Sequence, residues 1–290
     1  MPDDTTLETR QRIKAVGSVS SKILGGECGN SHKADADTSV IDSLYQQGSA
    51  RIRFPNKLKG PLEAVMLNTA GGLTGNDDIH WKGEALSQSH LCITNAACEK
   101  VYRTHGPAAY QNSELKAGSG ARLEWLPQET ILFNQANLNR SLHVELESDA
   151  QALIVESLVF GRHAMNEVAD NIVVKDRWRV YRNQQILHAE DLHIDTRTNP
   201  NLHSSSQLHH FGAISTLLLV GPWPQEWLDK MATTLKSIKF GARVKIGISV
   251  LPSRLIVRLV AKDSFQLRKI LIPYVETING GRAVPTIWKV

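Results

Sequence analysis

The sequence predicts a mostly β protein with about two α-helices near its C-terminus. Short apolar or alternating runs, bounded by Gly, Pro or Asn, recur along most of the chain, which is typical of folds with many strands. Apolar residues at helical spacing dominate two segments, and both follow residue 220. We therefore expect stacked or coiled, antiparallel-rich sheets, arranged as in a β-helix or a sandwich.

Composition and patterning indicate one domain preceded by a tail. The 290 residues are 41% hydrophobic, which is enough for one large domain or two small ones. No linker and no repeat of fixed period interrupts residues 43–290, so we expect a single domain there. Residues 1–42 are polar and aperiodic, and they predict an N-terminal tail that lacks order of its own.

Three features predict a cytoplasmic protein without a membrane segment. No apolar run approaches the ~20 residues needed to cross a bilayer. The first residues, Met1–Thr6, contain no cationic region followed by an apolar one, as a signal peptide would. The three cysteines, Cys28, Cys92 and Cys98, are odd in number, which favours free thiols in a reducing compartment.

The strands are predicted by alternation and by short apolar runs. Residues 46–55 predict a turn and then a strand that Pro55 ends. Apolar and polar residues alternate with a period of two over residues 142–147, 172–180 and 244–250. Shorter apolar runs, bounded by turn-forming residues, predict further strands over residues 64–67, 79–81, 91–93, 153–155 and 217–220.

The two helices are predicted over residues 223–240 and 263–279. Pro224 lies near the first turn of the first segment, where proline is favoured. In the second segment, Asp263 can cap the start of the helix, and Gly280 and Gly281 can end it. Pro273 lies inside this segment and should kink or split the helix.

Charge is distributed unevenly along the chain. The whole chain carries +4 at pH 7, whereas residues 236–290 contain eleven basic and two acidic residues and carry +9. Residues 124–167 contain seven acidic and two basic residues and carry −5. The basic end favours an acidic partner, and a solvated basic face is the alternative. A salt-sensitive nucleic-acid interface would also need aromatic platforms, which are few here, so we expect no nucleic-acid partner.

The glycine-rich stretch at residues 69–78 predicts a turn between two strands. No Gly-Lys-Ser or Gly-Lys-Thr follows it, and its glycine spacing does not fit a dinucleotide fingerprint. Gly71, Gly72 and Gly75 instead allow positive φ angles and close approach of the backbone.

Histidines and cysteines offer two weak candidates for a metal site. Cys92 and Cys98 are six residues apart, near His80, His90 and His105, but their spacing is not that of a zinc site. A polar loop contains three further histidines that can capture a divalent metal weakly, namely His203, His209 and His210. We therefore expect no permanently bound metal.

Three carboxylates adjoin apolar runs and are the candidate functional residues: Glu124, Glu129 and Glu156. A carboxylate in such surroundings lies on a solvated strand face or is buried with a partner. Converging carboxylates would permit acid–base chemistry, as in glycoside hydrolysis, or weak binding of a divalent cation. A strand-rich, metal-dependent hydrolase is therefore the alternative function, although no Gly-x-Ser-x-Gly or His-Glu-x-x-His motif is present.

Four ordered segments in the middle of the chain carry a more specific pattern. They contain, in turn, Gly71, Gly72, Gly75 and Asp77; Lys100, Tyr102 and Arg103; Trp125, Pro127 and Gln128; and Gly161, Arg162 and Glu167. These segments resemble the UreD (UreH) family of urease accessory proteins, and the run Trp-Leu-Pro-Gln-Glu at 125–129 is the most specific part. The chain departs from the family pattern at Asn76, usually glycine, at Cys98, usually a small or hydroxyl residue, and at Thr286, commonly arginine.

The resemblance implies a scaffold and not an enzyme. Proteins of this family bind the accessory protein UreF, which recruits the GTPase UreG, and the assembly docks on the urease apoprotein to deliver nickel. The resemblance also implies that nickel is bound transiently and passes through an internal channel, for which Glu124, Glu129 and Glu156 are the candidate ligands. Arg162 lies between Glu156 and Glu167 in sequence and is suited to clamp a carboxylate with both arms of its guanidinium.

Overall fold

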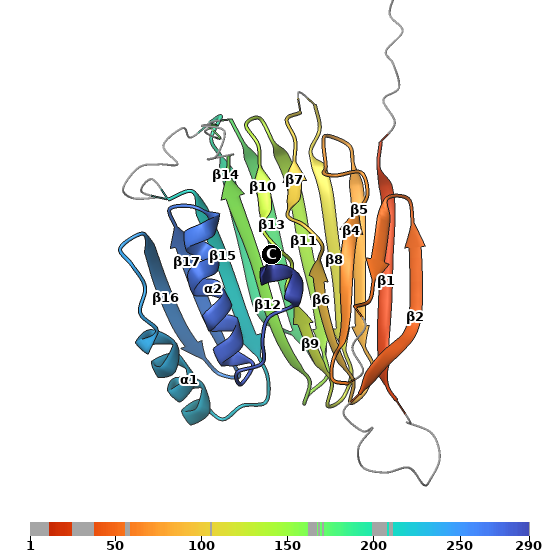
Figure 1. Cartoon of the computed structure of the whole chain (residues 1–290), viewed down its shortest axis with the longest axis vertical. Helices are drawn as coiled ribbons and strands as arrows, with labels where there is room; N and C mark the ends of the chain where they lie inside the picture. Colours follow the sequence, from red (N-terminus) through yellow and green to blue (C-terminus); the bar gives the residue numbers. More distant parts are fainter. Residues whose placement is uncertain are drawn as a thin grey trace, which may run out of the picture.

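Two β-sheets stacked face to face form the molecule, and two helices cover part of the outer face of one sheet (Figure 1). The computed structural model describes residues 12–24, 38–55, 59–104, 106–161, 167, 169, 171–198, 208 and 211–289. This architecture confirms the predicted mostly β fold with stacked sheets and two helices near the C-terminus.

The first sheet has seven strands in the order β14-β13-β11-β8-β5-β1-β2. In chain order these are β1 (Lys14–Ile23), β2 (Ser39–Gln47), β5 (Asp78–Ala85), β8 (Ala109–Ala117), β11 (Asn137–Leu146), β13 (Val173–Arg182) and β14 (Gln185–Asp195).

The second sheet follows the order β16-β17-β15-β12-β9-β6-β4-β3, with β10 paired to β12 and β7 paired to β10. Its strands are β3 (Ala50–Arg53), β4 (Leu62–Asn68), β6 (His90–Asn95), β7 (Glu99–Val101), β9 (Arg122–Trp125), β10 (Thr130–Leu132), β12 (Gln151–Phe160), β15 (Ala213–Val220), β16 (Val244–Leu251) and β17 (Arg254–Ala261).

The centre of the molecule is coiled, because the chain passes back and forth between the sheets. β5, β8, β11 and β13 are added in turn to the first sheet, and β6, β9 and β12 to the second, each parallel to its predecessor. Antiparallel pairs join strands toward the sheet margins, such as β1 with β2 and β15 with β17. The sheets are therefore mixed: the antiparallel pairing expected from the sequence is found from β12 through β15 and β17 to β16 and in the pairs β1–β2, β3–β4 and β13–β14.

Two layers of apolar side chains hold the fold together. One layer lies between the sheets, and the other lies between the second sheet and the helices. In β12, Ile154 and Leu158 belong to the first layer and Val155 and Val159 to the second. The strand is apolar along most of its length because both of its faces are buried.

The helices α1 (Gln225–Ser237) and α2 (Ser264–Ile278) lie where the sequence predicts them. Asp263 caps α2, since its Oδ1 accepts a hydrogen bond of 2.8 Å from the backbone N–H of Gln266. α2 continues through Pro273 without splitting, because its buried face is held against β15 and β17. None of the helices in the described ranges is long and apolar enough to cross a membrane.

The N-terminal region differs from the predicted tail. β1 begins at Lys14, pairs in parallel with β5, and pairs antiparallel with β2, which begins at Ser39. Small and polar residues give β1 a weak pattern, and the strand is stabilised by pairing with residues 64 positions away, such as Lys14 with Asp78. Residues 1–11 and 25–37 of the expected tail lie outside the described residues.

Candidate functional site: buried carboxylates on two faces of one sheet

The three candidate carboxylates are buried, but they lie on opposite faces of the second sheet. Glu124, Glu129 and Glu156 are 0%, 3% and 4% exposed. Glu124 and Glu129 contact Arg282 and Arg268, on the side covered by the helices. Glu156 instead faces the first sheet. The sheet therefore separates Glu156 from the other two, and the converging arrangement considered for a hydrolase is absent from this part of the structure.

Glu124 is the centre of a cluster that joins the segment after α2 to the sheet. His90 Nε2 and Arg122 Nε each lie 3.0 Å from Glu124 Oε1, and Arg282 and Asn279 also contact the carboxylate. Burial by itself would raise the pKa of Glu124, but the hydrogen bond from His90 and the nearby positive charges lower it to about 2. Glu124 is thus an ionised anchor with its acceptors engaged.

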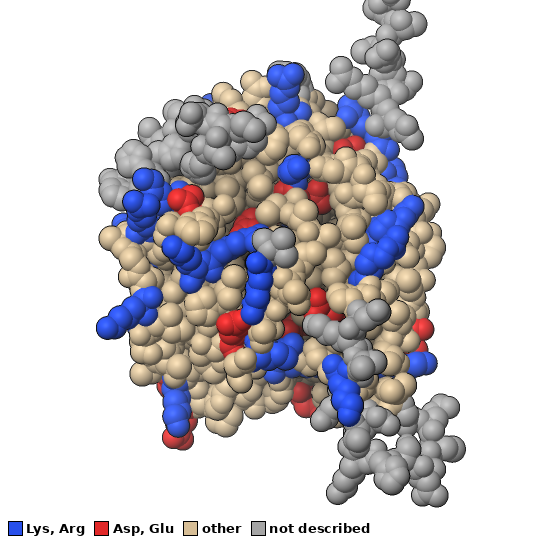
Figure 2. Space-filling view, viewed as in Figure 1, with Lys and Arg blue, Asp and Glu red and all other residues tan. Residues whose placement is uncertain are grey.

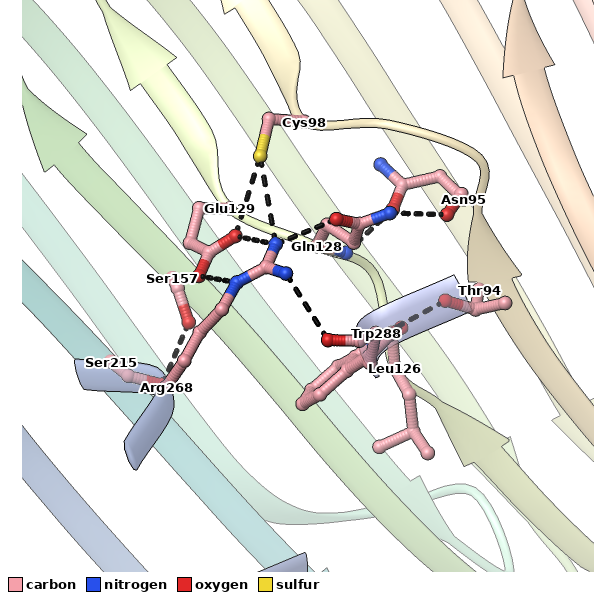
Figure 3. Close-up of polar contacts among 10 residues, drawn as sticks. All are labelled: Thr94, Asn95, Cys98, Leu126, Gln128, Glu129, Ser157, Ser215, Arg268 and Trp288. Carbon is pink, nitrogen blue, oxygen red and sulfur yellow. Dashed lines mark hydrogen bonds and ion pairs between the residues drawn. The ribbon is translucent and has the colours of Figure 1, made fainter. Parts of the chain in front are cut away.

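Glu129 is held by α2 in the same way (Figure 3). Arg268 Nε lies 2.7 Å from Oε1 and Arg268 Nη2 lies 2.6 Å from Oε2, so the contact is bidentate. The thiol of Cys98 donates to Glu129 Oε2 at 3.4 Å. Burial, reinforced by the charge of Glu129, raises the pKa of Cys98 to about 11. At neutral pH Cys98 is therefore a protonated thiol, not the thiolate that metals prefer.

The C-terminal end of the chain is fixed to the same motif. The short 3₁₀ helix η3 (Thr286–Lys289) places Trp288 so that its Nε1–H donates to Leu126 O and Thr94 Oγ1, both at 3.1 Å (Figure 3). Arg268 Nη1 donates to Trp288 O at 3.3 Å and Nη2 to Gln128 Oε1 at 2.6 Å. The Trp-Leu-Pro-Gln-Glu run is thus the docking surface for the C-terminal segment.

Glu156 belongs to a polar cluster between the sheets. The indole N–H groups of Trp125 and Trp178 donate to its two oxygens, each at 3.0 Å. Arg140 Nη2 lies 3.2 Å from Glu156 Oε2 and also contacts Asp176 Oδ2. Burial, with the charge of Asp176, raises the pKa of Glu156 to about 7 against the opposing effect of Arg140.

Two cavities adjoin this cluster. The larger, of about 170 Å³, is lined by residues that include Asn68, Cys98, Glu99, Gln111 and Arg140. The smaller, of about 20 Å³, is lined by residues that include Arg140, Glu156, Asp176, Glu190 and Thr216. Because Arg140 lines both, its side chain stands between them in the space that separates the sheets.

The glycine-rich stretch forms the turn predicted between two strands. Gly71 and Gly72 have φ angles of +79° and +152°, and a Cβ atom at Gly72 would lie 2.4 Å from the Tyr102 ring. Tyr102 OH donates to Gly71 O at 3.1 Å. Asp77 is buried and accepts hydrogen bonds from the backbone N–H groups of Ile13 at 2.9 Å and Thr74 at 2.7 Å. The contacts of this motif therefore fix the path of the backbone through the turn.

The other residues of the family pattern have backbone roles or lie near the larger cavity. Lys100 O accepts from the N–H of Leu73 at 2.7 Å, and Gly75 packs against Thr104. A single bridge pairs Arg103 with Ala136. Gly161 has a φ of +79°, Glu167 accepts from the N–H of Asn134 at 2.8 Å, and Pro127 lines the cavity.

Several predictions lie outside the described residues. Arg162, His105, His203, His209, His210 and Cys28 belong to ranges that the structure does not describe, so the arginine clamp and the histidine-loop metal site stay predictions. Cys92 is buried beneath the helices. Within the described ranges, no group of three His, Cys, Asp or Glu side chains is placed to hold a metal ion.

Sequence analysis missed the cationic half of these clusters, namely Arg140, Arg268 and Arg282, and also the acid Asp176. A signal was present for two of them. In β11, Arg140 lies two residues after Leu138 and two before Leu142, so all three side chains are on the strand face that points into the core. In β13, Asp176 has the same spacing from Val174 and Trp178. A charged residue on the otherwise apolar face of a strand indicates that a buried partner compensates its charge.

A family model and several known proteins are similar to this chain over most of its length. A sequence model of the family described as UreD urease accessory protein matches residues 27–289. The urease accessory protein UreD of a Chelativorans species is 37% identical to this chain, and the match covers 99% of this chain and 98% of the relative. The protein of the same name from Rhizobium etli is 38% identical, and the match covers 96% of both chains. One from Brucella abortus, named UreD 1, is 38% identical over 97% of this chain and 95% of its own. This chain therefore belongs to the UreD family of urease accessory proteins.

Proposed function

We propose that this protein is a non-enzymatic cytoplasmic scaffold that joins a UreF-like protein, and through it a UreG-like GTPase, to the urease apoprotein during nickel insertion. The observation that carries the proposal is the family match over nearly the whole chain. The name of the relatives supports a role beside urease, and the partners are inferred from the family resemblance. Nickel is cargo in this proposal, bound weakly and in transit.

The face that contains α2 and the C-terminal segment is our candidate for the partner surface. Figure 2 shows Lys and Arg side chains spread over this face, and residues 236–290 carry a net +9. Phe265 of α2 is 62% exposed, with Lys269 Nζ 4.4 Å from its ring centre, and Phe240 is 45% exposed. Exposed aromatic rings beside basic groups suit an acidic partner with apolar anchors.

For metal transit, the structure supports Glu156 better than Glu124 or Glu129. Glu124 and Glu129 are each paired with arginine on the helix side and line neither of the two cavities, whereas Glu156 shares Arg140 with a second carboxylate, Asp176. Glu156 lines the smaller cavity, and its partner Arg140 lines both cavities. Carboxylate and water are ligands that nickel accepts and releases.

The partner surface is tested by pull-down from a urease-positive lysate. Tagged wild-type protein is expected to capture the urease subunits, a UreF-like protein and a small GTPase. The variant Phe265→Ser/Lys269→Glu should lose the UreF-like protein and the GTPase, because it removes the anchor and reverses the charge. Lys175→Glu, on an exposed position of β13 in the other sheet, is the matched control. Absence of all three partners from the wild-type capture would refute the scaffold.

Metal transit is tested separately by the nickel content of urease activated in cells. Glu156→Gln keeps the size of the side chain and removes its charge, so we expect normal assembly with poorly metallated urease. Glu114→Gln, which alters a partly exposed carboxylate 2.8 Å from Lys82, should change neither. Fully metallated urease with an assembled Glu156→Gln protein would place the path elsewhere.

A further inference from the structure

We propose that Glu156 and Asp176 form a latent divalent-cation site and that Arg140 occupies it with its own guanidinium, so that the resting protein retains no metal there. The site itself follows from the geometry of three residues. Its role in limiting metal retention rests on the proposed passage of nickel.

The geometry is that of one cationic centre shared by two carboxylates. Glu156 projects from β12 of the second sheet and Asp176 from β13 of the first. Arg140 Nη2 is 3.2 Å from Glu156 Oε2 and also bonds Asp176 Oδ2. The three residues are 3% to 7% exposed, so a single nitrogen supplies positive charge to both carboxylates away from solvent. A divalent ion between the same oxygens would serve the same purpose.

The cluster also has unused hydrogen-bonding capacity that points to a ligand. Asp176 Oδ1 and Arg140 Nε are buried, and neither has a hydrogen-bond partner among the described residues. Asp176 lines the smaller cavity, whose 20 Å³ is enough for one water molecule. Gln111 Oε1, which is likewise unpartnered within the described ranges, belongs to a residue that lines the larger cavity on the other side of Arg140.

The surroundings suit a cation that prefers oxygen. Two carboxylates, with room for water in the adjoining cavities, offer the oxygen ligands that manganese, cobalt, nickel and magnesium accept. The indole N–H groups of Trp125 and Trp178 hold the Glu156 carboxylate in place, as outer-shell donors do for ligating carboxylates. Arg140 competes directly with such an ion, because its positive charge already neutralises much of the charge that would attract the ion.

Removing this competitor should expose the site. In Arg140→Met, two buried carboxylates would lack a counter-charge, a costly state that a bound cation relieves. We would measure binding of Co²⁺ alone to the isolated full-length protein by equilibrium dialysis and from its visible absorption. We expect about one ion per chain, bound on the order of tenfold or more tightly than by the wild type. The triple variant Arg140→Met/Glu156→Gln/Asp176→Asn should lose this binding.

The folding of Arg140→Met is tested by its melting temperature with and without Co²⁺. If Arg140→Met is unstable without an ion, Co²⁺ should raise its melting temperature and leave that of the triple variant unchanged. If Arg140→Met does not fold even with Co²⁺, the wild type decides: weak Co²⁺ binding at high concentration should disappear in Glu156→Gln/Asp176→Asn. Binding that is equal in Arg140→Met and the wild type, or that survives in the carboxylate variants, overturns the latent site. None of these metal-binding results tests the proposed scaffold function. That function is refuted separately, if the wild-type protein captures none of its expected partners from the lysate.

Discussion

Arg268 and Glu129 form a bidentate ion pair across 139 residues of sequence, with N–O distances of 2.7 and 2.6 Å. The pair joins α2 to the loop that precedes β10. The same arginine contacts Gln128 Oε1 and Trp288 O. The segment that most strongly carries the family resemblance therefore holds the C-terminal helix and the end of the chain against the second sheet.

Replacing this arginine should weaken the attachment of α2. Arg268→Lys keeps the charge but cannot form the fork that contacts both oxygens of Glu129. Glu129 is buried, so we expect the free energy of unfolding to fall by about 1–3 kcal/mol, measured by urea denaturation. Lys269→Ala changes the adjacent, exposed cation beside Phe265, and it should shift stability by less than about 0.5 kcal/mol. Equal stability of Arg268→Lys and the wild type would show that the fork is dispensable.

The end of the chain is stabilised by one indole. Trp288→Phe preserves an aromatic ring but removes the N–H that donates to Leu126 O and Thr94 Oγ1. Because Leu126 O would be left buried without this donor, we expect the free energy of unfolding to fall by about 1–3 kcal/mol. Faster amide exchange of Leu271 and Tyr274 would show that α2 loosens with it. In Trp227→Phe, which alters the half-buried ring stacked on Trp223, exchange in α2 should be unchanged. The docking role fails if Trp288→Phe behaves in the same way.

Stability should depend on pH through Glu99. Burial raises the pKa of this side chain from 4.5 to about 7, although Asn68 donates to it at 3.2 Å. Between these values the folded chain binds more protons at Glu99 than the unfolded chain, so this contribution to stability falls as pH rises.

Glu99→Gln should remove that contribution. We expect the variant to be about 1–2 kcal/mol more stable than the wild type at pH 8 and nearly equal to it at pH 4.5, measured by denaturant unfolding at each pH. Glu114→Gln provides a comparison at a partly exposed carboxylate. A difference between Glu99→Gln and the wild type that does not grow with pH would contradict the raised pKa.

Local patterns in the sequence determined the element types. Alternation over residues 142–147 and 244–250 became β11 and β16, and apolar spacing of 3.6 residues became α1 and α2. The glycine turn and the Asp263 cap also followed from local chemistry, because each depends on atoms only a few residues apart. The ordered motifs identified the family without knowledge of any contact.

Pairing and placement were decided by the tertiary structure. β1 is a strand because β5, 64 residues away, supplies its parallel partner, and no local pattern encodes that partner. The sequence grouped Glu124, Glu129 and Glu156 by their apolar neighbours, whereas the sheet places Glu156 on the opposite face. Their ion-pair partners are Arg268 and Arg282 on one side of the sheet and Arg140, which Glu156 shares with Asp176, on the other. Burial and ion pairing depend on distances in space, so a carboxylate's partner, its pKa and its access to a cavity emerge only when distant segments pack together.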